Sequence, residues 1–155
     1  MNKGHDFIRK ARLAMTNITK ELSIAQLNEI PAGFNNNIAW NMAHLIATQQ
    51  IVCYRRAGID TVVDAEFVDT YAPGTRPERF ITEEEVLRIV ELFSTSLDRY
   101  ELDMHAGLFN NYTAWTTRAG VDVNNINDAD AFLPYHEGMH VGYIMALKKL
   151  VSKAQ

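Results

Sequence analysis

Apolar residues recur at intervals of three and four positions in four separate stretches of this 155-residue sequence. That interval matches the turn of an α-helix, so each stretch is predicted to form a helix with one apolar face. The predicted helices cover residues 8–25, 37–57, 82–106 and 127–151. No two stretches alternate apolar and polar residues convincingly enough to predict a pair of strands. The sequence therefore predicts an all-α fold, a four-helix bundle in one domain spanning residues 1–155.

Local signals mark where the predicted helices begin and end. Thr82 and Glu85 form a capping box at the start of the third helix, and Gly58 and Gly107 follow the second and third helices. The connection over residues 58–81 is too long for a tight hairpin, so we expect a crossover that lets the second and third helices run parallel. The four helices would then have an up-down-down-up topology. The connection before the fourth helix contains TTRAGVDV, a candidate for a short extended excursion.

Composition and charge narrow the classes of partner. The formal net charge is −4 and the sequence has no basic cluster, which argues against nucleic-acid binding. No apolar run is long enough to span a membrane, and the N-terminal segment MNKGHDFIRKARLAM lacks a signal-peptide pattern. Cys53 is the only cysteine and cannot form an internal disulfide, which suits a reducing compartment. We therefore expect a soluble, cytoplasmic protein.

The segment YHEGMH near the C-terminus contains the HExxH pattern of zinc peptidases, formed by His136, Glu137 and His140. On a helix, His136 and His140 lie one turn apart on the same face as Leu133 and Leu147, so both imidazoles are predicted to point inward. Two buried imidazoles are costly unless something binds them. A metal ion is one explanation. The alternative is a pair of core histidines with buried hydrogen-bond partners.

A third metal ligand has to come from elsewhere in the chain. The sequence after His140 contains no His, Asp or Glu, which removes both common arrangements of zinc peptidases. His44 lies between an apolar and a polar side of the second predicted helix and is the candidate, with an ordinary boundary histidine as the alternative. His5 is expected to be solvated, and His105 to cap the C-terminus of the third helix. A peptidase is therefore not expected.

Two stretches of the sequence are similar to a known family. GFNNNIAWNMAHLIATQQ, with Trp40 and His44, and LPYHEGMHVGYIMALKKL, with His136 and His140, resemble the DinB-like superfamily of DinB/YfiT-like metalloenzymes. The resemblance extends over essentially the whole chain. It implies an up-down-down-up four-helix bundle, frequent homodimers and a divalent metal held by three histidines. Those histidines correspond here to His44, His136 and His140.

The resemblance implies less about the reaction. Several relatives are metal-dependent transferases or isomerases that use a low-molecular-weight thiol, and many others have no known activity. We expect a divalent ion, zinc first with nickel, manganese or iron as alternatives, to activate a thiol or water toward a small-molecule substrate. Glu137 is either a catalytic base or a solvated surface carboxylate. The alternatives are a metal-dependent hydrolase and a non-catalytic module that binds a metal or a small ligand.

Two helix surfaces bear on how the protein packs. The second predicted helix is apolar almost all round, because it also carries apolar residues away from the His44 face: Ile38, Met42, Leu45, Ile46 and Val52. A small bundle covers only part of such a surface, so we expect a homodimer. In the fourth helix, Gly138, Gly142 and Ala146 recur every four residues, which indicates close packing against another helix.

Overall fold

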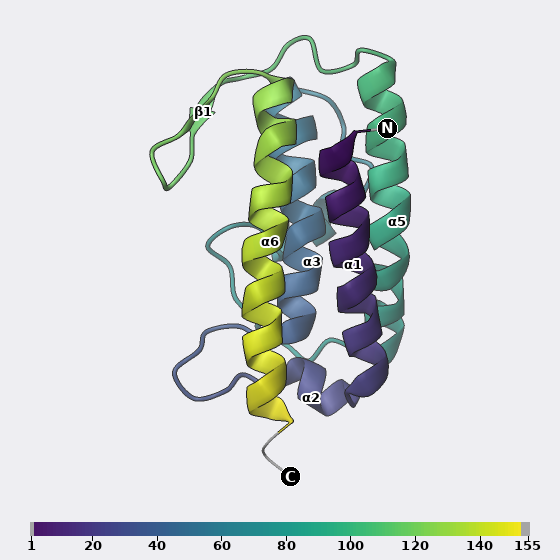
Figure 1. Ribbon diagram of the computed structural model, residues 1–155, viewed down its shortest axis with the longest axis vertical. Coiled ribbons are helices and arrows are strands. Elements are labelled where there is room, and N and C mark those ends of the chain that lie inside the picture. Colours follow the sequence, from purple (N-terminus) through teal and green to yellow (C-terminus); the bar gives the residue numbers. More distant parts are fainter. Residues whose placement is uncertain (1, 153–155) are drawn as a thin grey trace.

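Four long helices lie side by side in the computed structural model, which describes residues 2–152 (Figure 1). They are α1 (Lys3–Glu21), α3 (Ile38–Gln49), α5 (Glu83–His105) and α6 (Ile126–Val151). Two short helices, α2 (Ile24–Asn28) and α4 (Ala65–Thr70), lie in the connections. In Figure 1, α1 and α6 run from top to bottom, whereas α3 and α5 run from bottom to top. The predicted all-α class is confirmed.

The helix boundaries follow the capping signals in the sequence. The Thr82 side chain accepts a hydrogen bond from the Glu85 amide, and the Glu85 carboxylate accepts one from the Thr82 amide, which is the predicted capping box. Asparagine side chains cap the N-termini of α1, α3 and α6. Gly58 and Gly107 each have a φ of 70°, a left-handed conformation that favours glycine after a helix. Both predicted helix ends are therefore correct.

The second predicted helix is one continuous helical segment in the structure, but its hydrogen bonding changes from the α-helical to the π-helical pattern along its length. α3 is followed directly by a π-helical stretch, η1 (Gln50–Arg55), before the chain turns at Gly58. Every residue of α3 is buried, because α2, α4, α5 and α6 all pack against it. The apolar surface that suggested a dimer is therefore covered within one chain. The homodimer stays a prediction, but this surface no longer supports it.

Two long connections join the helices. The connection from α3 to α5 crosses the length of the molecule, because α3 ends near the top of Figure 1 and α5 begins near the bottom. The connection from α5 to α6 contains an antiparallel hairpin, β1 (Trp115–Thr116) and β2 (Asp122–Val123), in the segment where an extended excursion was predicted. No helix among residues 2–152 is long and apolar enough to cross a membrane.

The buried apolar residues form two clusters with a polar layer between them. On α1, Ile8 belongs to one cluster and Met15 to the other, and the buried Arg12 lies between them. The same order holds on the other three long helices, where the buried polar residues between the clusters are Gln49, Ser96 and Glu137. The predicted site residues on α6 therefore lie where the apolar core is interrupted.

Candidate metal centre

His44, His136 and His140 converge in the core from two helices. α3 carries His44, and α6 carries His136 and His140 one turn apart. One nitrogen of each ring lies within 4.8 Å of one nitrogen of each of the other two. The ring centroids are 5.3 Å apart for His44 and His136, 4.8 Å for His44 and His140, and 4.6 Å for His136 and His140. The structure thus brings together the three residues predicted as metal ligands.

Hydrogen bonds orient two of the three rings. His44 Nδ1 donates to the carbonyl oxygen of Tyr71 over 2.7 Å. His140 Nδ1 donates over 2.8 Å to Oδ1 of Asn41, whose amide nitrogen donates to the carbonyl of Asn37 and so fixes which atom faces His140. Because both Nδ1 atoms carry the proton, the Nε2 atoms keep a lone pair; that of His44 faces the Thr48 hydroxyl at 3.2 Å. That is the form of histidine that binds a metal.

His136 has no such partner. It is buried, yet neither of its ring nitrogens makes a hydrogen bond to any residue from 2 to 152. Its ring packs against Phe132, with the centroids 5.4 Å apart, and against the other two histidines. A buried polar group without a partner normally destabilises a fold. His136 is 9% exposed, so its ring nitrogens are free to bind a ligand from outside the chain.

Burial keeps all three imidazoles neutral. Burial lowers the pKa of His136 to about 3, with a contribution from the neighbouring His140 and His44. Burial and the neighbouring His44 lower the pKa of His140 to about 4. Burial also lowers the pKa of His44, against the hydrogen bond to Tyr71. Because a histidine must lose its proton before it binds a metal, all three residues are in the binding form at neutral pH.

The donor set fits a single divalent ion. Zinc binds imidazole nitrogens at about 2.0–2.1 Å, so the ligands of a tetrahedral site lie about 3.4 Å apart. The nitrogens here lie within 4.8 Å of one another, so the rings would have to move closer to share one ion. Imidazole suits zinc, nickel and iron, whereas manganese favours oxygen ligands. A possible metal site is present, and the choice of zinc stays a prediction.

Glu137 lies in the polar layer and is not part of the histidine cluster. It is 3% exposed, and its Oε1 accepts a hydrogen bond from Arg12 Nε over 2.6 Å. Arg12 also donates to the Gln49 side chain, the Phe93 carbonyl and the Ser96 hydroxyl. The expectation of a solvated surface carboxylate is therefore wrong, because Glu137 is buried against Arg12 of α1. A catalytic role for Glu137 stays a prediction, which this pairing does not favour.

The sequence contains a signal for this pair. Arg12 lies four residues after Ile8 and three residues before Met15, so it is on the apolar face of α1. A charged side chain at such a position is almost never buried without a partner of opposite charge. Arg12 therefore predicts a buried acidic residue on a neighbouring helix, although it does not say which one.

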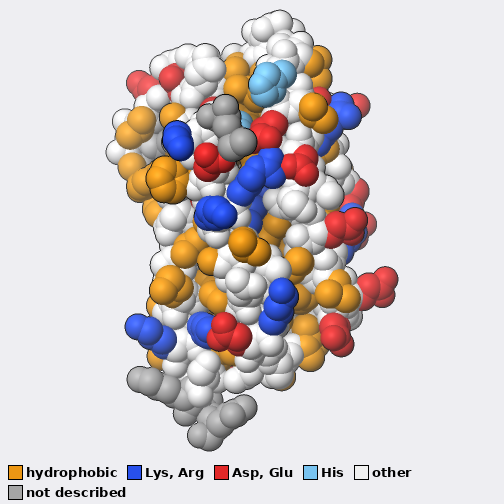
Figure 2. Space-filling model, turned by 45° about the vertical axis from the view of Figure 1, so that its right-hand side comes forward, with side chains coloured by type: hydrophobic (Ala, Val, Ile, Leu, Met, Phe, Trp, Pro, Cys, Tyr) orange, Lys and Arg blue, Asp and Glu red, His pale blue; other side chains and the backbone are white. Residues whose placement is uncertain are grey.

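The remaining histidines differ in their environment. His5 is 5% exposed rather than solvated, which corrects the prediction, because Asp130 of α6 lies 2.6 Å from its Nε2 and Glu101 of α5 lies 2.9 Å from its Nδ1. Figure 2 shows acidic and basic side chains close together on one face of the molecule. His105 is exposed, and its Nδ1 donates to the carbonyl of Glu101 in the last turn of α5, as predicted for a cap.

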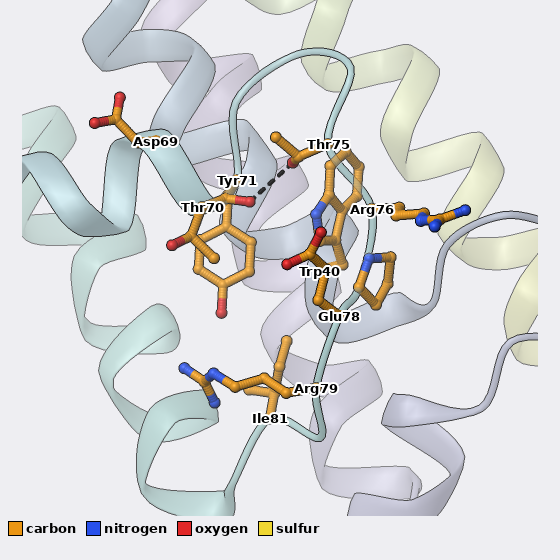
Figure 3. Close-up of a pocket in the computed structure, with 10 residues that line it drawn as sticks. Trp40, Asp69, Thr70, Tyr71, Thr75, Arg76, Glu78, Arg79 and Ile81 are labelled. Carbon is orange, nitrogen blue, oxygen red and sulfur yellow. Dashed lines mark hydrogen bonds between the residues drawn. The ribbon is translucent and has the colours of Figure 1, made fainter.

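A cavity of about 450 Å³ lies beside the histidine cluster, between α4 and the segment that leads to α5 (Figure 3). Trp40 and Tyr71 line the cavity and also contact His44: the Trp40 ring stacks on the imidazole with centroids 4.7 Å apart, and the Tyr71 carbonyl accepts its proton. None of the three histidines lines the cavity. The cavity and the donor set therefore share walls without forming one pocket.

The fold and the donor set define a class of protein, a helical protein with a possible three-histidine metal site. The sequence matches the DinB superfamily over residues 8–144, a range that includes all three histidines. Because the match covers most of the sequence, the chain belongs to the DinB superfamily, and the resemblance noted in the sequence is confirmed. No curated protein matches the chain significantly.

Proposed function

We propose that this protein is a metal-dependent enzyme that binds one divalent ion through His44, His136 and His140 and activates a low-molecular-weight thiol. The observation that carries this proposal is the convergence of three neutral imidazoles, one of which has no hydrogen-bond partner among residues 2–152. Three protein ligands leave at least one coordination position open, which is typical of catalytic rather than structural zinc sites.

The residues of the chain prepare the site in two ways. Tyr71 and Asn41 hold the rings of His44 and His140 with their Nε2 atoms unprotonated, and the Thr48 hydroxyl lies 3.2 Å from the Nε2 of His44. The buried surroundings keep protons off all three ligands, so no proton has to leave before the ion binds. A divalent ion in such a site lowers the pKa of a thiol or water beside it and favours the nucleophilic anion.

The proposed reaction is a transfer to sulfur. The thiolate sulfur forms a bond to a carbon atom of a small electrophile, the leaving group departs with the bonding electron pair, and the thiol proton passes to solvent. Water is the alternative nucleophile and would make the protein a hydrolase. We propose no peptidase activity, because Glu137 is held by Arg12 and no acidic or histidine ligand follows His140.

A non-catalytic metal-binding module is the second candidate function. One observation favours it: the cavity of about 450 Å³ beside the site is not lined by any of the three histidines. A substrate in that cavity would be separated from the ion by Trp40 and Tyr71. In this alternative the ion stabilises the fold and no turnover occurs.

The proposal also includes the topology of the helix bundle and the cellular location of the protein. The opposite directions of α1 and α6 relative to α3 and α5 in Figure 1 support an up-down-down-up four-helix bundle. The long crossover between α3 and α5 supports the same order. A cytoplasmic location is supported by the buried free thiol of Cys53, which needs no oxidising compartment.

The experiment is a turnover assay with the zinc-loaded protein, purified without a histidine tag. Several low-molecular-weight thiols are each combined with an electrophile whose thioether product is coloured or fluorescent. We expect thioether formation that depends on the metal and is lost in His136→Ala, whereas His105→Ala, which changes an exposed histidine outside the cluster, retains it. Stoichiometric zinc without turnover for any thiol would contradict the enzyme and favour the binding module.

A further inference from the structure

The cavity of about 450 Å³ beside the histidine cluster, named here the Trp40 cavity, has a buried hydrogen-bond donor in its wall. Trp40 is 4% exposed, yet its indole nitrogen makes no hydrogen bond to any residue from 2 to 152. In Figure 3 the nitrogen edge of the indole ring is turned toward the side of the cavity on which Tyr71 lies. A buried N–H group without an acceptor is unfavourable, so an oxygen atom of a ligand would satisfy it.

The charge that faces the Trp40 cavity is negative. Four charged residues line it: Asp69, Arg76, Glu78 and Arg79. Asp69 and Arg79 each form an ion pair with a residue outside the cavity. In Figure 3 the Arg76 side chain points away toward α6, whereas the Glu78 carboxylate points into the cavity. Glu78 forms no ion pair or hydrogen bond with any described residue, so its charge is not compensated by the chain.

The rest of the cavity suits a hydrocarbon group. The rings of Trp40 and Tyr71 and the side chain of Ile81 line it, and all three residues are buried. Its volume lies within the range of roughly 300–1,000 Å³ that is typical of small-molecule sites. Such sites combine apolar walls with a few polar groups that select the ligand, and here those groups are the indole N–H and the Glu78 carboxylate.

We propose that the Trp40 cavity binds a small organic ammonium ion that also carries an oxygen acceptor, such as an amino alcohol or the amide of an amino acid. The ammonium group donates to the Glu78 carboxylate, and the oxygen accepts a hydrogen bond from the Trp40 indole N–H. The hydrocarbon part packs against Tyr71 and Ile81. An amine without the oxygen leaves the indole unpaired, and an alcohol without the amine leaves Glu78 unpaired, so both groups define the class of ligand.

The ligand site is separate from the metal centre. None of the three histidines lines the Trp40 cavity, and the residues that lie between the two sites are Trp40 and Tyr71. A ligand in the cavity therefore does not coordinate the ion, and it should bind to the zinc-loaded and to the metal-free protein alike. For this reason the proposal does not rest on the proposed enzymatic function, and either one can fail without the other.

Fluorescence of Trp40 measures binding directly once the other tryptophan is replaced by Trp115→Phe. The probes are leucinol, isoamylamine, which lacks its hydroxymethyl group, and isohexanol, which lacks its amine. We expect a saturable change with leucinol, dissociation constants at least about 10-fold higher for the other two compounds, and the same leucinol affinity in zinc-loaded and chelator-treated protein. No saturable change with leucinol, equal affinity for either of the other compounds, or binding only when zinc is present would overturn the proposal.

Two variants test the two polar contacts by calorimetry. Glu78→Gln changes an exposed residue, so the fold should persist while the dissociation constant of leucinol rises at least about 10-fold. The matched control is Glu84→Gln, an exposed carboxylate in the first turn of α5 that does not line the cavity, and it should bind leucinol as the wild type does. Trp40→Phe keeps an aromatic ring beside His44 but removes the N–H, so leucinol should lose its advantage over isoamylamine. Wild-type leucinol affinity in Glu78→Gln, or an unchanged preference for leucinol in Trp40→Phe, would overturn the proposal.

Discussion

His136 and Glu137 are adjacent in the sequence and both buried, yet they occupy opposite kinds of environment. Glu137 pairs with Arg12, which in turn binds groups of α3 and α5, so this polar cluster is satisfied by the chain itself. His136 faces two other imidazoles and makes no hydrogen bond to any described residue. The comparison teaches that a buried cluster whose groups bind one another holds a fold together, whereas a histidine cluster with free ring nitrogens can bind a ligand.

The largest effect should come from breaking the satisfied cluster. Glu137→Gln leaves the Arg12 guanidinium buried without an opposite charge, which should lower the free energy of unfolding by about 3–5 kcal/mol. Denaturant unfolding of the metal-free protein measures this change. The control is Glu21→Gln, which removes an exposed ion pair with Lys148 and should cost about 0.5 kcal/mol. Equal effects for both variants would contradict the structural role of Glu137.

Removal of one histidine from the three-histidine cluster should abolish metal binding. With zinc at about 100 times the dissociation constant, the ion should stabilise the wild type by about 2.7 kcal/mol, because the unfolded chain cannot assemble the site. His44→Ala should lose the bound zinc and the rise in Tm that zinc produces. His5→Ala and His105→Ala should keep both. Zinc binding that survives in His44→Ala but fails in His105→Ala would place the site elsewhere.

The residue that orients His140 should matter less than a ligand. Asn41→Ala removes the acceptor for His140 Nδ1, and loss of such a partner typically weakens metal binding about 10- to 100-fold. Competition with a zinc chelator measures the affinity. Asn35→Ala, an exposed change in the loop before α3, should leave the affinity unchanged. If both variants bind zinc as the wild type does, the orientation of His140 is not important for the site.

The contrast between the two clusters also predicts opposite changes in the stability of the metal-free protein. Replacing His136 should raise the free energy of unfolding, whereas replacing Glu137 should lower it. His136→Leu removes a buried imidazole that has no hydrogen-bond partner and replaces it with an apolar side chain of similar size. We expect the free energy of unfolding to rise by about 1 kcal/mol, while zinc binding is lost. Calorimetry of the chelator-treated variant checks this. A loss of stability comparable to that of Glu137→Gln would remove the distinction between the two clusters.

The His5 contact should have a small, pH-dependent effect. The hydrogen bond to Asp130 and the nearby Glu101 raise the pKa of His5 above its ordinary value of 6.5, while burial opposes them. Protonated His5 therefore stabilises the fold below pH 6.5, and this contribution fades as the pH rises through the raised pKa. His5→Gln should lose about 1 kcal/mol at pH 5.5 and less at pH 9 in denaturant unfolding. A loss that grows with pH would contradict this assignment.

The sequence predicted the helices and the inward direction of His136 and His140 because both depend on local spacing. The capping box at Thr82 and the glycines after α3 and α5 mark the helix ends within a few residues. His136 and His140 share the apolar face of one helix, so their inward direction follows from that helix alone. His44 was the candidate because it lies inside the second predicted helix, with an ordinary boundary histidine as the alternative, and the family resemblance implied the same residue.

The sequence could not predict which polar residues are buried, because burial depends on distant segments. Arg12 and Glu137 are 125 positions apart, and no local pattern joins them. His5 is in the first turn of α1, yet α5 and α6 cover it with Glu101 and Asp130. For the same reason, the apolar surface of α3 did not reveal how many neighbours of its own chain surround it.

The most direct test of the central claim is X-ray diffraction from crystals of the zinc-loaded protein, collected at the zinc absorption edge, after purification without a histidine tag. The account predicts one anomalous peak per chain, about 2.0–2.1 Å from a nitrogen atom of each of His44, His136 and His140, with Glu137 still paired to Arg12. A peak at Glu137 or at the His5 contact, or no peak in protein saturated with zinc, would contradict it.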